Sequence, residues 1–218
     1  MLVAIGLLLL PLSTSANIAT SDVPTAIVKT DNTVLAKKDG AISIEAGSKQ
    51  LAKINALYGK EITQAEFIKT IYPEALEVIP TEVLKEYENM RFVFGQEDTS
   101  VSNESKFIDN NKRGIIIGTI SSGRSGPANN LFHDGKTVTT GPSNLSTTST
   151  LEKNISGTIV TVSSAYDFSS NSTLSYASAY YNGVAGLYRT VSYHVSAPPG
   201  YNPWAGTSYA NLNFAQVN

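Results

Sequence analysis

Apolar residues follow three different patterns along the chain, and each pattern predicts a different kind of structure. Residues 2–12 form one continuous apolar run. Between residues 48 and 89 the apolar positions recur every three or four residues, which is the period of an amphipathic helix. From residue 114 onwards, β-branched and aromatic runs alternate with Gly, Pro, Asn and Ser clusters, as in antiparallel sheets. The chain is therefore predicted to be mainly β with a small α region.

The apolar run at residues 2–12 has the length of the hydrophobic region of a signal peptide, about 7–15 residues. Thr14 and Ala16 supply the small side chains that a signal peptidase reads, so we expect residues 1–16 to be removed. A membrane-spanning helix needs about 20 apolar residues, and Pro11 interrupts the run well before that length. No Lys or Arg precedes the run, so the leader is atypical or its true start lies upstream. The sequence predicts a secreted or cell-surface protein with no transmembrane span in the mature chain.

The next two segments are short and differ in character. Residues 17–47 contain apolar pieces and turn-prone pairs such as Asp39-Gly40, which predict either an extended tether or a hairpin. Residues 48–95 are predicted to form a small helical region of three or four short helices. The clearest helix start is at Thr63, because Glu66 three residues later completes a capping box. The other helix signals are Ser48 as an N-cap, Gly59 as a stop, and Pro73 and Pro80 in first turns.

Residues 106–218 are predicted to form an antiparallel β-sandwich domain of six or seven strands. The clearest turn signal is Asn182-Gly183, because Asn-Gly fits the two central positions of a type I′ turn. A hairpin through that turn places Tyr180 opposite Ala185. The face that carries Tyr180 is the more apolar one, so we expect it to point at the core. The face that carries Ala177 is then a solvent-facing or contact surface.

The segment Gly186-Leu187-Tyr188 resembles the Gly-x-Tyr start of the sixth strand of immunoglobulin-like domains, where the tyrosine corner lies. The resemblance implies an immunoglobulin-like β-sandwich in which Tyr188 and Thr190 are buried, whereas the hairpin register buries Leu187 and Val191. The chain has no cysteine, so the family's disulfide is absent and packing must hold the sandwich together. As a whole, the layout resembles uncharacterised exported archaeal proteins, and that resemblance implies no activity.

Charge separates the chain into two parts without pointing to a charged partner. Residues 17–105 carry 9 basic and 14 acidic side chains, and residues 106–218 carry 7 basic and 4 acidic ones. The net charge of −2 does not suggest binding to nucleic acid. The acidic residues between positions 74 and 88 are interpreted as a solvated helix face.

Candidate chemistry is sparse. The only histidines are His133 and His194, too few for a typical metal site, so we expect no metal and no cofactor. Four Asn-x-Ser/Thr sequons are candidate glycosylation sites on exposed loops or turns, which would make this a glycoprotein if it is exported. These sequons begin at Asn103, Asn144, Asn154 and Asn171.

Exposed aromatic side chains are the remaining candidates for ligand binding. They can stack on a sugar ring or anchor a partner, and the alternative is that they cap the end of the core. The candidates are Tyr180, Tyr181, Tyr201 and Trp204. The leading hypothesis is an exported non-enzymatic module that acts in adhesion, assembly or binding of an unknown protein or glycan partner. The alternatives are a carbohydrate-binding module and a secreted hydrolase.

Overall fold

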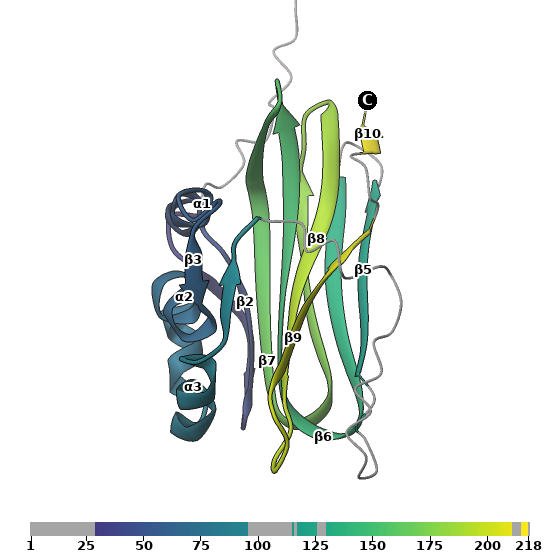
Figure 1. Cartoon of the computed structure of the whole chain (residues 1–218). Coiled ribbons are helices and arrows are strands. Elements are labelled where there is room, and N and C mark those ends of the chain that lie inside the picture. Colours follow the sequence, from purple (N-terminus) through teal and green to yellow (C-terminus); the bar gives the residue numbers. More distant parts are fainter. Residues whose placement is uncertain (1–28, 96–114, 116, 126–129, 211–214, 218) are drawn as a thin grey trace, which may run out of the picture.

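The computed structural model describes residues 29–95, 115, 117–125, 130–210 and 215–217. In chain order the elements are β1 (Thr33–Lys38), β2 (Ala41–Glu45), α1 (Ser48–Asn55), β3 (Glu61–Thr63), α2 (Gln64–Ile71), the 3-10 helix η1 (Pro73–Glu77), α3 (Thr81–Tyr87), β4 (Arg91–Val93), β5 (Ile117–Ser125), β6 (Asn130–Ile155), β7 (Thr158–Asn182), β8 (Gly186–Ala197), β9 (Trp204–Tyr209) and β10 (Ala215–Val217). Eight strands of this described part form one antiparallel sheet in the order β1-β2-β7-β6-β8-β10, with β5 also paired to β6 and β9 to β8 (Figure 1). Strands β3 and β4 form a separate two-stranded sheet. Within the described residues the protein is thus mainly β with three short α-helices.

Strands β6 and β7 form one long hairpin that bends back on itself. Its tip is Ser156-Gly157, where both residues are left-handed (φ 53° and 89°), as a type I′ turn requires. Pairing continues from this tip to Asn130 and Asn182. An extended strand rises about 3.3 Å per residue, so His133 and Ser149 would lie roughly 50 Å apart if β6 were straight. Their side chains are 2.9 Å apart, so the strand must fold over.

The bend lies where the pairing register shifts, between Val138 and Ser143 of β6. Asn171, on the opposite strand, is left-handed there (φ 49°). We call β5 together with residues 130–138 and 174–182 the outer half of the sheet. We call residues 143–155 and 158–172, together with β1, β2, β8 and β9, the helix-covered half. The two halves face each other in a sandwich-like arrangement, with the helices on the far side of the second half (Figure 1).

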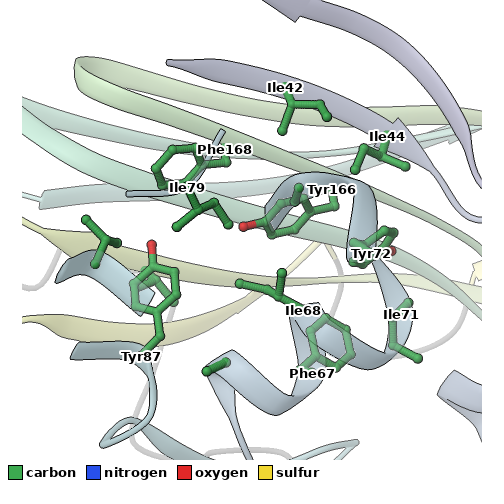
Figure 2. Packing of buried hydrophobic residues seen from close by; sticks show 14 of the residues in the cluster. Ile42, Ile44, Phe67, Ile68, Ile71, Tyr72, Ile79, Tyr87, Tyr166 and Phe168 are labelled. Carbon is green, nitrogen blue, oxygen red and sulfur yellow. The ribbon is translucent and has the colours of Figure 1, made fainter. Parts of the chain in front are cut away.

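The apolar core lies between the helices and the helix-covered half (Figure 2). The rings of Tyr72, after α2, and Tyr166, in β7, stack with centroids 5.0 Å apart. The Tyr72 hydroxyl lies 2.7 Å from the Ser164 hydroxyl, so its polar end is satisfied inside the core. Each large apolar side chain buried in such a core contributes about 1.5–3 kcal/mol to stability. The sheet and the helices contribute Ile42, Ile44, Phe67, Ile68, Ile71, Ile79, Tyr87 and Phe168 to this cluster.

Two of the predicted helix starts were confirmed, and a third was wrong. The capping box is present, because the Glu66 backbone N–H donates to the Thr63 hydroxyl and the Thr63 N–H donates to the Glu66 carboxylate. Pro73 begins η1 as predicted. Ser48 is the first residue of α1 and not its N-cap. Its hydroxyl donates to the Lys29 carbonyl instead, so the cap prediction was wrong.

The prediction that the helical region precedes a separate β-sandwich domain was wrong. Strands β1 and β2 come before them, form a hairpin that turns at Asp39-Gly40, and belong to the main sheet. Strand β2 pairs with β7, for example Ile44 with Tyr166, which brings the beginning of the described chain beside its longest strands. The helical segment is therefore a crossover between β2 and β5 that packs on the sheet it leaves.

The predicted hairpin through Asn182-Gly183 was also wrong. The end of β7 pairs with the start of β6, and β8 pairs with the other end of β6. The buried face is reversed as well, because Tyr180 is 68% exposed while Ala177 and Ala179 are buried. The two halves of the sheet lie so close that a Cβ on Gly135 would lie 2.5 Å from the Ser192 hydroxyl oxygen. The approach is this close at Gly135, and the large side chains of Tyr176 and Tyr180 point outward.

The tyrosine corner suggested by the sequence has the geometry of that motif. Tyr188 and Thr190 are both buried and Leu187 is exposed, while Val191, which the hairpin register placed in the core, is buried as well. The Tyr188 hydroxyl donates to the carbonyl oxygen of Val184 at 2.6 Å, four residues upstream. A tyrosine near the start of a strand that bonds back to the preceding backbone is what defines this corner.

Candidate functional site

The candidate site is the outward-facing surface of the outer half, which we call the outer face. Successive residues of a strand point to opposite sides, so alternate positions of β5, β6 and β7 share this surface. Cross-strand pairing arranges them in rows of three. The rows are Arg124, Phe132 and Tyr180; then Ser122, Asp134 and Ser178; then Ile120, Lys136 and Tyr176; then Gly118, Val138 and Leu174.

The first row brings two aromatic rings and a guanidinium group together. The rings of Phe132 and Tyr180 are 4.9 Å apart and tilted by 55°. The Arg124 guanidinium carbon lies 4.6 Å from the Phe132 ring centroid, within the range of a cation–π interaction. This contact orients the long arginine side chain while leaving Arg124 and Tyr180 open to solvent. The row therefore offers apolar ring surface and a positive charge side by side.

The second and third rows are joined by a hydrogen-bonded carboxylate. Asp134 accepts hydrogen bonds from the Ser122 hydroxyl and, at 2.9 Å, from the Tyr176 hydroxyl. Partial burial and then the Asp134 hydrogen bond raise the pKa of Tyr176, so its hydroxyl stays protonated. These bonds fix the polar groups beside the aromatic row in defined positions.

A buried carboxylate at the bend supports the outer face from beneath. Asp167 accepts hydrogen bonds from the Ser43 hydroxyl, from the Ser175 hydroxyl at 2.7 Å and from the Tyr176 backbone N–H at 3.1 Å. It thereby joins β2 to β7 on both sides of the bend. The contact with the Tyr176 N–H fixes the backbone that carries one of the exposed tyrosines.

A layer of polar side chains fills the space between the two halves of the sheet. His133 is fully buried in it, with Nδ1 2.9 Å from the Ser149 hydroxyl and Nε2 2.9 Å from the Ser163 hydroxyl. Burial lowers the pKa of His133 to about 3, so the ring is neutral near pH 7. Asp134 follows His133 in the strand and points to the opposite face, so the two side chains cannot share a metal ion.

His194 repeats this arrangement farther along the layer. Its Nδ1 lies 2.8 Å from the Thr137 hydroxyl and its Nε2 lies 2.7 Å from the Ser208 hydroxyl. Burial lowers the pKa of His194 to about 3. A neutral imidazole has one donor and one acceptor, and two hydroxyl partners satisfy both. Both histidines therefore bridge strands and do not reach the surface.

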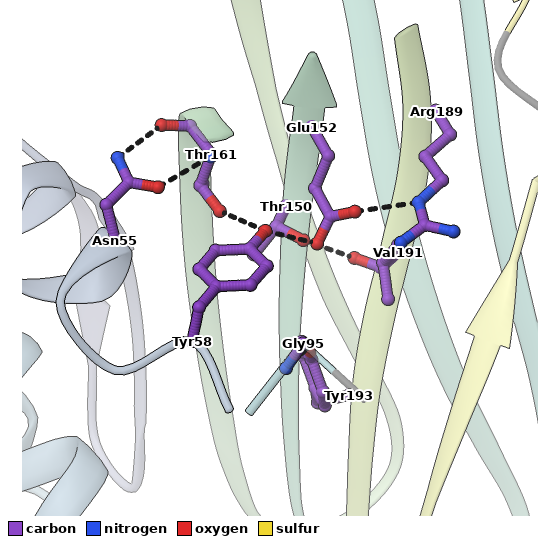
Figure 3. A network of polar contacts seen from close by, with 9 residues as sticks. All are labelled: Asn55, Tyr58, Gly95, Thr150, Glu152, Thr161, Arg189, Val191 and Tyr193. Carbon is purple, nitrogen blue, oxygen red and sulfur yellow. Dashed lines mark hydrogen bonds and ion pairs between the residues drawn. The ribbon is translucent and has the colours of Figure 1, made fainter. Parts of the chain in front are cut away.

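A second polar network attaches the helical layer to the sheet (Figure 3). Arg189 and Glu152 are almost completely buried, and the Arg189 Nε lies 2.7 Å from a carboxylate oxygen of Glu152. The Tyr58 hydroxyl donates to the other oxygen at 2.5 Å. Burial and then the Glu152 charge raise the pKa of Tyr58, so it remains a donor. The network contains groups found in active sites, but here each one serves as the partner of another.

The structure separates the four aromatic residues predicted to bind a ligand. Tyr180 lies on the outer face, and Tyr181, its neighbour in β7, points to the inner side of the sheet. The ring of Tyr181 lies 6.3 Å from that of Tyr188 and packs against a small cluster with Leu131 and Leu151. Tyr181 is therefore part of the packing beneath the surface.

Tyr201 and Trp204 lie at the other end of the molecule, where the chain passes from β8 to β9. The last residue of β8, Ala197, pairs with Asn144 beside the bend. Tyr180 lies eight residues beyond the bend along β7, or about 26 Å of strand. The four aromatic residues therefore do not form one surface.

The sequons also differ in their surroundings. Asn171 is exposed at the bend, whereas Asn144 and Asn154 are partly buried within β6. Asn103 lies outside the described residues.

The described ranges also contain no group of three or more His, Cys, Asp or Glu side chains that could hold a metal ion.

Comparison with known proteins gave no relative. The chain matches no family model, no curated protein and no solved structure. Within the part of the chain that the structure describes, no helix is long and apolar enough to cross a membrane.

Sequence reasoning did not identify most of the outer face. Arg124, Phe132, Asp134 and Tyr176 were not among the predicted site residues, although their positions alternate with buried ones. The signal that was available is the period-two pattern in residues 130–138, where Phe132, Asp134 and Lys136 alternate with residues that prove buried. It was missed because the more apolar set of the neighbouring strand, which includes Tyr180 and Leu174, was expected to point at the core.

Proposed function

We propose that the protein is an exported, non-enzymatic module that binds a partner in adhesion or surface assembly, and that the outer face is its binding surface. The observation that supports this most is the first row, in which Arg124 and Tyr180 are exposed beside Phe132. Tyrosine and arginine are enriched among the residues that dominate binding energy at interfaces. The carboxylate of Asp134 and its two hydroxyl donors provide directional contacts next to that row.

The role of the buried titratable groups also supports a binding module over a hydrolase. His133 and His194 each bridge strands through two hydroxyl groups, and Glu152 neutralises Arg189. A general acid or base must reach a substrate, and these side chains are enclosed. A secreted hydrolase remains the third candidate, and measurable turnover in a broad hydrolase screen would favour it.

We further propose that the sandwich is immunoglobulin-like, and the tyrosine corner at Tyr188 is the feature that supports this. The arrangement of strands differs from that of the usual immunoglobulin-like sandwich, in which each strand belongs to only one of the two sheets. Here one bent hairpin supplies strands to both layers.

Carbohydrate binding is the second candidate for the outer face. Tyr180 and Tyr176 are four residues apart on one strand, so their rings are separated by about 13 Å. Ring faces at such a separation, with the row of Asp134 and Ser178 between them, suit an extended oligosaccharide better than a single sugar. Tyr201 and Trp204 are too far from this surface to take part in the same site.

Export is tested by fractionating cells that produce the full chain with a C-terminal tag. The expected result is tagged protein outside the cytoplasm with an N-terminus at Asn17. Protein that stays in the cytoplasm with residues 1–16 attached would reject the export proposal.

Binding is tested with labelled mature protein on intact producing cells and, in parallel, on a glycan array. Tyr180→Ala and Arg124→Ala are each expected to weaken binding at least about fivefold, corresponding to 1 kcal/mol or more. Tyr201→Ala is the matched control, because it removes the same ring from an exposed loop at the other end. Equal loss from the control variant, or no loss from Tyr180→Ala, would reject the outer face as the site. Binding only to glycans would select the second candidate.

A further inference from the structure

Asn171 is the best exposed of the three described sequons. The sequon is Asn171-Ser172-Thr173, and both Asn171 and Thr173 are exposed. Pairing between β6 and β7 passes from Leu145 with Ser169 to Ser143 with Ser172, so Asn171 is left without a partner in the ladder. An enzyme can therefore approach this backbone without breaking the sheet.

The left-handed backbone of Asn171 is itself held in place by the neighbouring sequon. The Asn171 backbone N–H donates to the Asn144 side-chain oxygen at 3.4 Å, and the Ser170 hydroxyl donates to the same oxygen at 2.8 Å. Asn is one of the few residues that adopts this conformation readily. Asn171 is exposed, and its side-chain amide makes no hydrogen bond to the part of the chain that the structure describes.

The Asn144 sequon has the opposite character. Its side-chain oxygen already accepts the two bonds that hold the bend. Its third residue, Ser146, is buried under the helical layer, with its hydroxyl 3.4 Å from the Gln64 amide nitrogen. A transferase must contact both the asparagine and the hydroxyl residue of the sequon, and here the hydroxyl is enclosed.

The Asn154 sequon is enclosed by strands on both sides. Asn154 pairs with Ile159 in β7 and with Leu187 in β8. Its side-chain oxygen also accepts the Gly157 backbone N–H at 2.8 Å, which stabilises the type I′ turn. Presenting Asn154 to an enzyme requires opening two ladders at the hairpin tip.

We propose that Asn171 is an N-glycosylation site of the folded, exported protein, and that Asn144 and Asn154 are not modified once the sheet has formed. This rests on the export proposed above. The donor is an oligosaccharide linked to a lipid through phosphate. The Asn171 Nδ2 forms a bond to the anomeric carbon, the bond from that carbon to the phosphate oxygen breaks, and the lipid phosphate leaves with the electron pair. The displaced amide proton passes to a base of the transferase.

The experiment compares folded protein with short peptides. Unmodified full-length mature chain is incubated with a purified oligosaccharyltransferase and a lipid-linked oligosaccharide, and glycopeptides are quantified by mass spectrometry. Synthetic peptides containing each sequon are treated in parallel and report how well the sequences alone are accepted. We expect Asn171 to be modified in the folded chain at least tenfold faster than Asn144 and Asn154, after each rate is divided by that of its peptide.

Two variants identify the modified atom and the recognition element. Asn171→Gln is expected to abolish modification of this peptide, and Thr173→Ala is expected to do the same while leaving the asparagine in place. Comparable rates at the three sequons in folded protein would overturn the proposal, as would an unmodified Asn171 in the folded chain or in its peptide. Mapping the glycosylated residues of protein isolated from producing cells separates the glycosylation proposal from the export proposal. Exported protein with bare Asn171 rejects glycosylation alone, whereas retention in the cytoplasm rejects export.

Discussion

Acid should destabilise this protein through the two buried histidines. His133 and His194 sit between the halves of the sheet with no exposed surface. Burial lowers the pKa of each ring to about 3, whereas the usual pKa of histidine in an unfolded chain is about 6.5. The stabilisation is therefore fully present above pH 6.5 and is lost as the pH falls towards 3, because the unfolded chain binds two protons that the folded chain does not.

The magnitude follows from the difference in proton binding. At pH 4.5 the unfolded state is favoured by about 2–3 kcal/mol for each histidine, since the pH is two units below the unfolded pKa. The pair then removes about 5 kcal/mol, which is comparable to the whole stability of many domains. Between pH 6 and pH 5 the free energy of unfolding should fall by about 2–3 kcal/mol.

The assay is urea unfolding followed by far-UV circular dichroism at half-unit steps from pH 7.5 to pH 4.5. His133→Gln and His194→Gln each remove one titrating ring, so either variant should halve the slope between pH 6 and pH 5, whatever its stability at neutral pH. This window lies above the range in which exposed carboxylates such as Glu66 and Glu77, whose pKa values are lowered, take up protons. A slope unchanged in both variants, or stability independent of pH in this window, would refute the reasoning.

Two further perturbations test how the sheet is held together. Glu152→Gln should lower the free energy of unfolding by about 3–5 kcal/mol, because it removes the carboxylate charge that lies 2.7 Å from the buried Arg189 guanidinium. Replacing both residues with apolar ones of similar size should recover most of that loss in the same urea assay, and a double variant as unstable as the single one would contradict this. Gly135→Ala should cost about 1–3 kcal/mol, because its Cβ would lie 2.7 Å from the Ser192 Cβ, whereas the control Gly118→Ala meets nothing within 4 Å. Equal melting temperatures for the two glycine variants would show that the halves are not in close contact.

Features that depend on neighbouring residues could be predicted from the sequence. The capping box at Thr63 and Glu66 is complete within four residues. Pro73 begins a helical turn because its ring fixes the φ angle near the helical value. The burial of Tyr188 and its bond to the Val184 carbonyl likewise agree with the short Gly-x-Tyr motif. Each of these is set by local backbone geometry, which a sequence pattern reports directly.

Long-range pairing was not predictable in the same way. Asn182-Gly183 has the composition of a tight turn, but the chain crosses there between the two halves of the sheet, and Ser156-Gly157 forms the tight turn instead. The rule that the more apolar face is buried also failed for Tyr180. The polar layer is thin and accepts residues such as Ala177, so the usual relation between hydrophobicity and burial is inverted. The outer face was missed for the same physical reason.

The order in which the chain is synthesised has a consequence for the pairing of β2. Ile44 leaves the ribosome early, yet its partner Tyr166 in β7 follows more than a hundred residues later. Until β7 has emerged, β2 and the helices that pack on it have no sheet to join, because such distant contacts form only after a costly loop closure. Strand β2 and these helices therefore cannot reach their final structure before β7 has been synthesised. Passage through a translocation channel in an unfolded state, which the proposed export would require, would benefit from that delay.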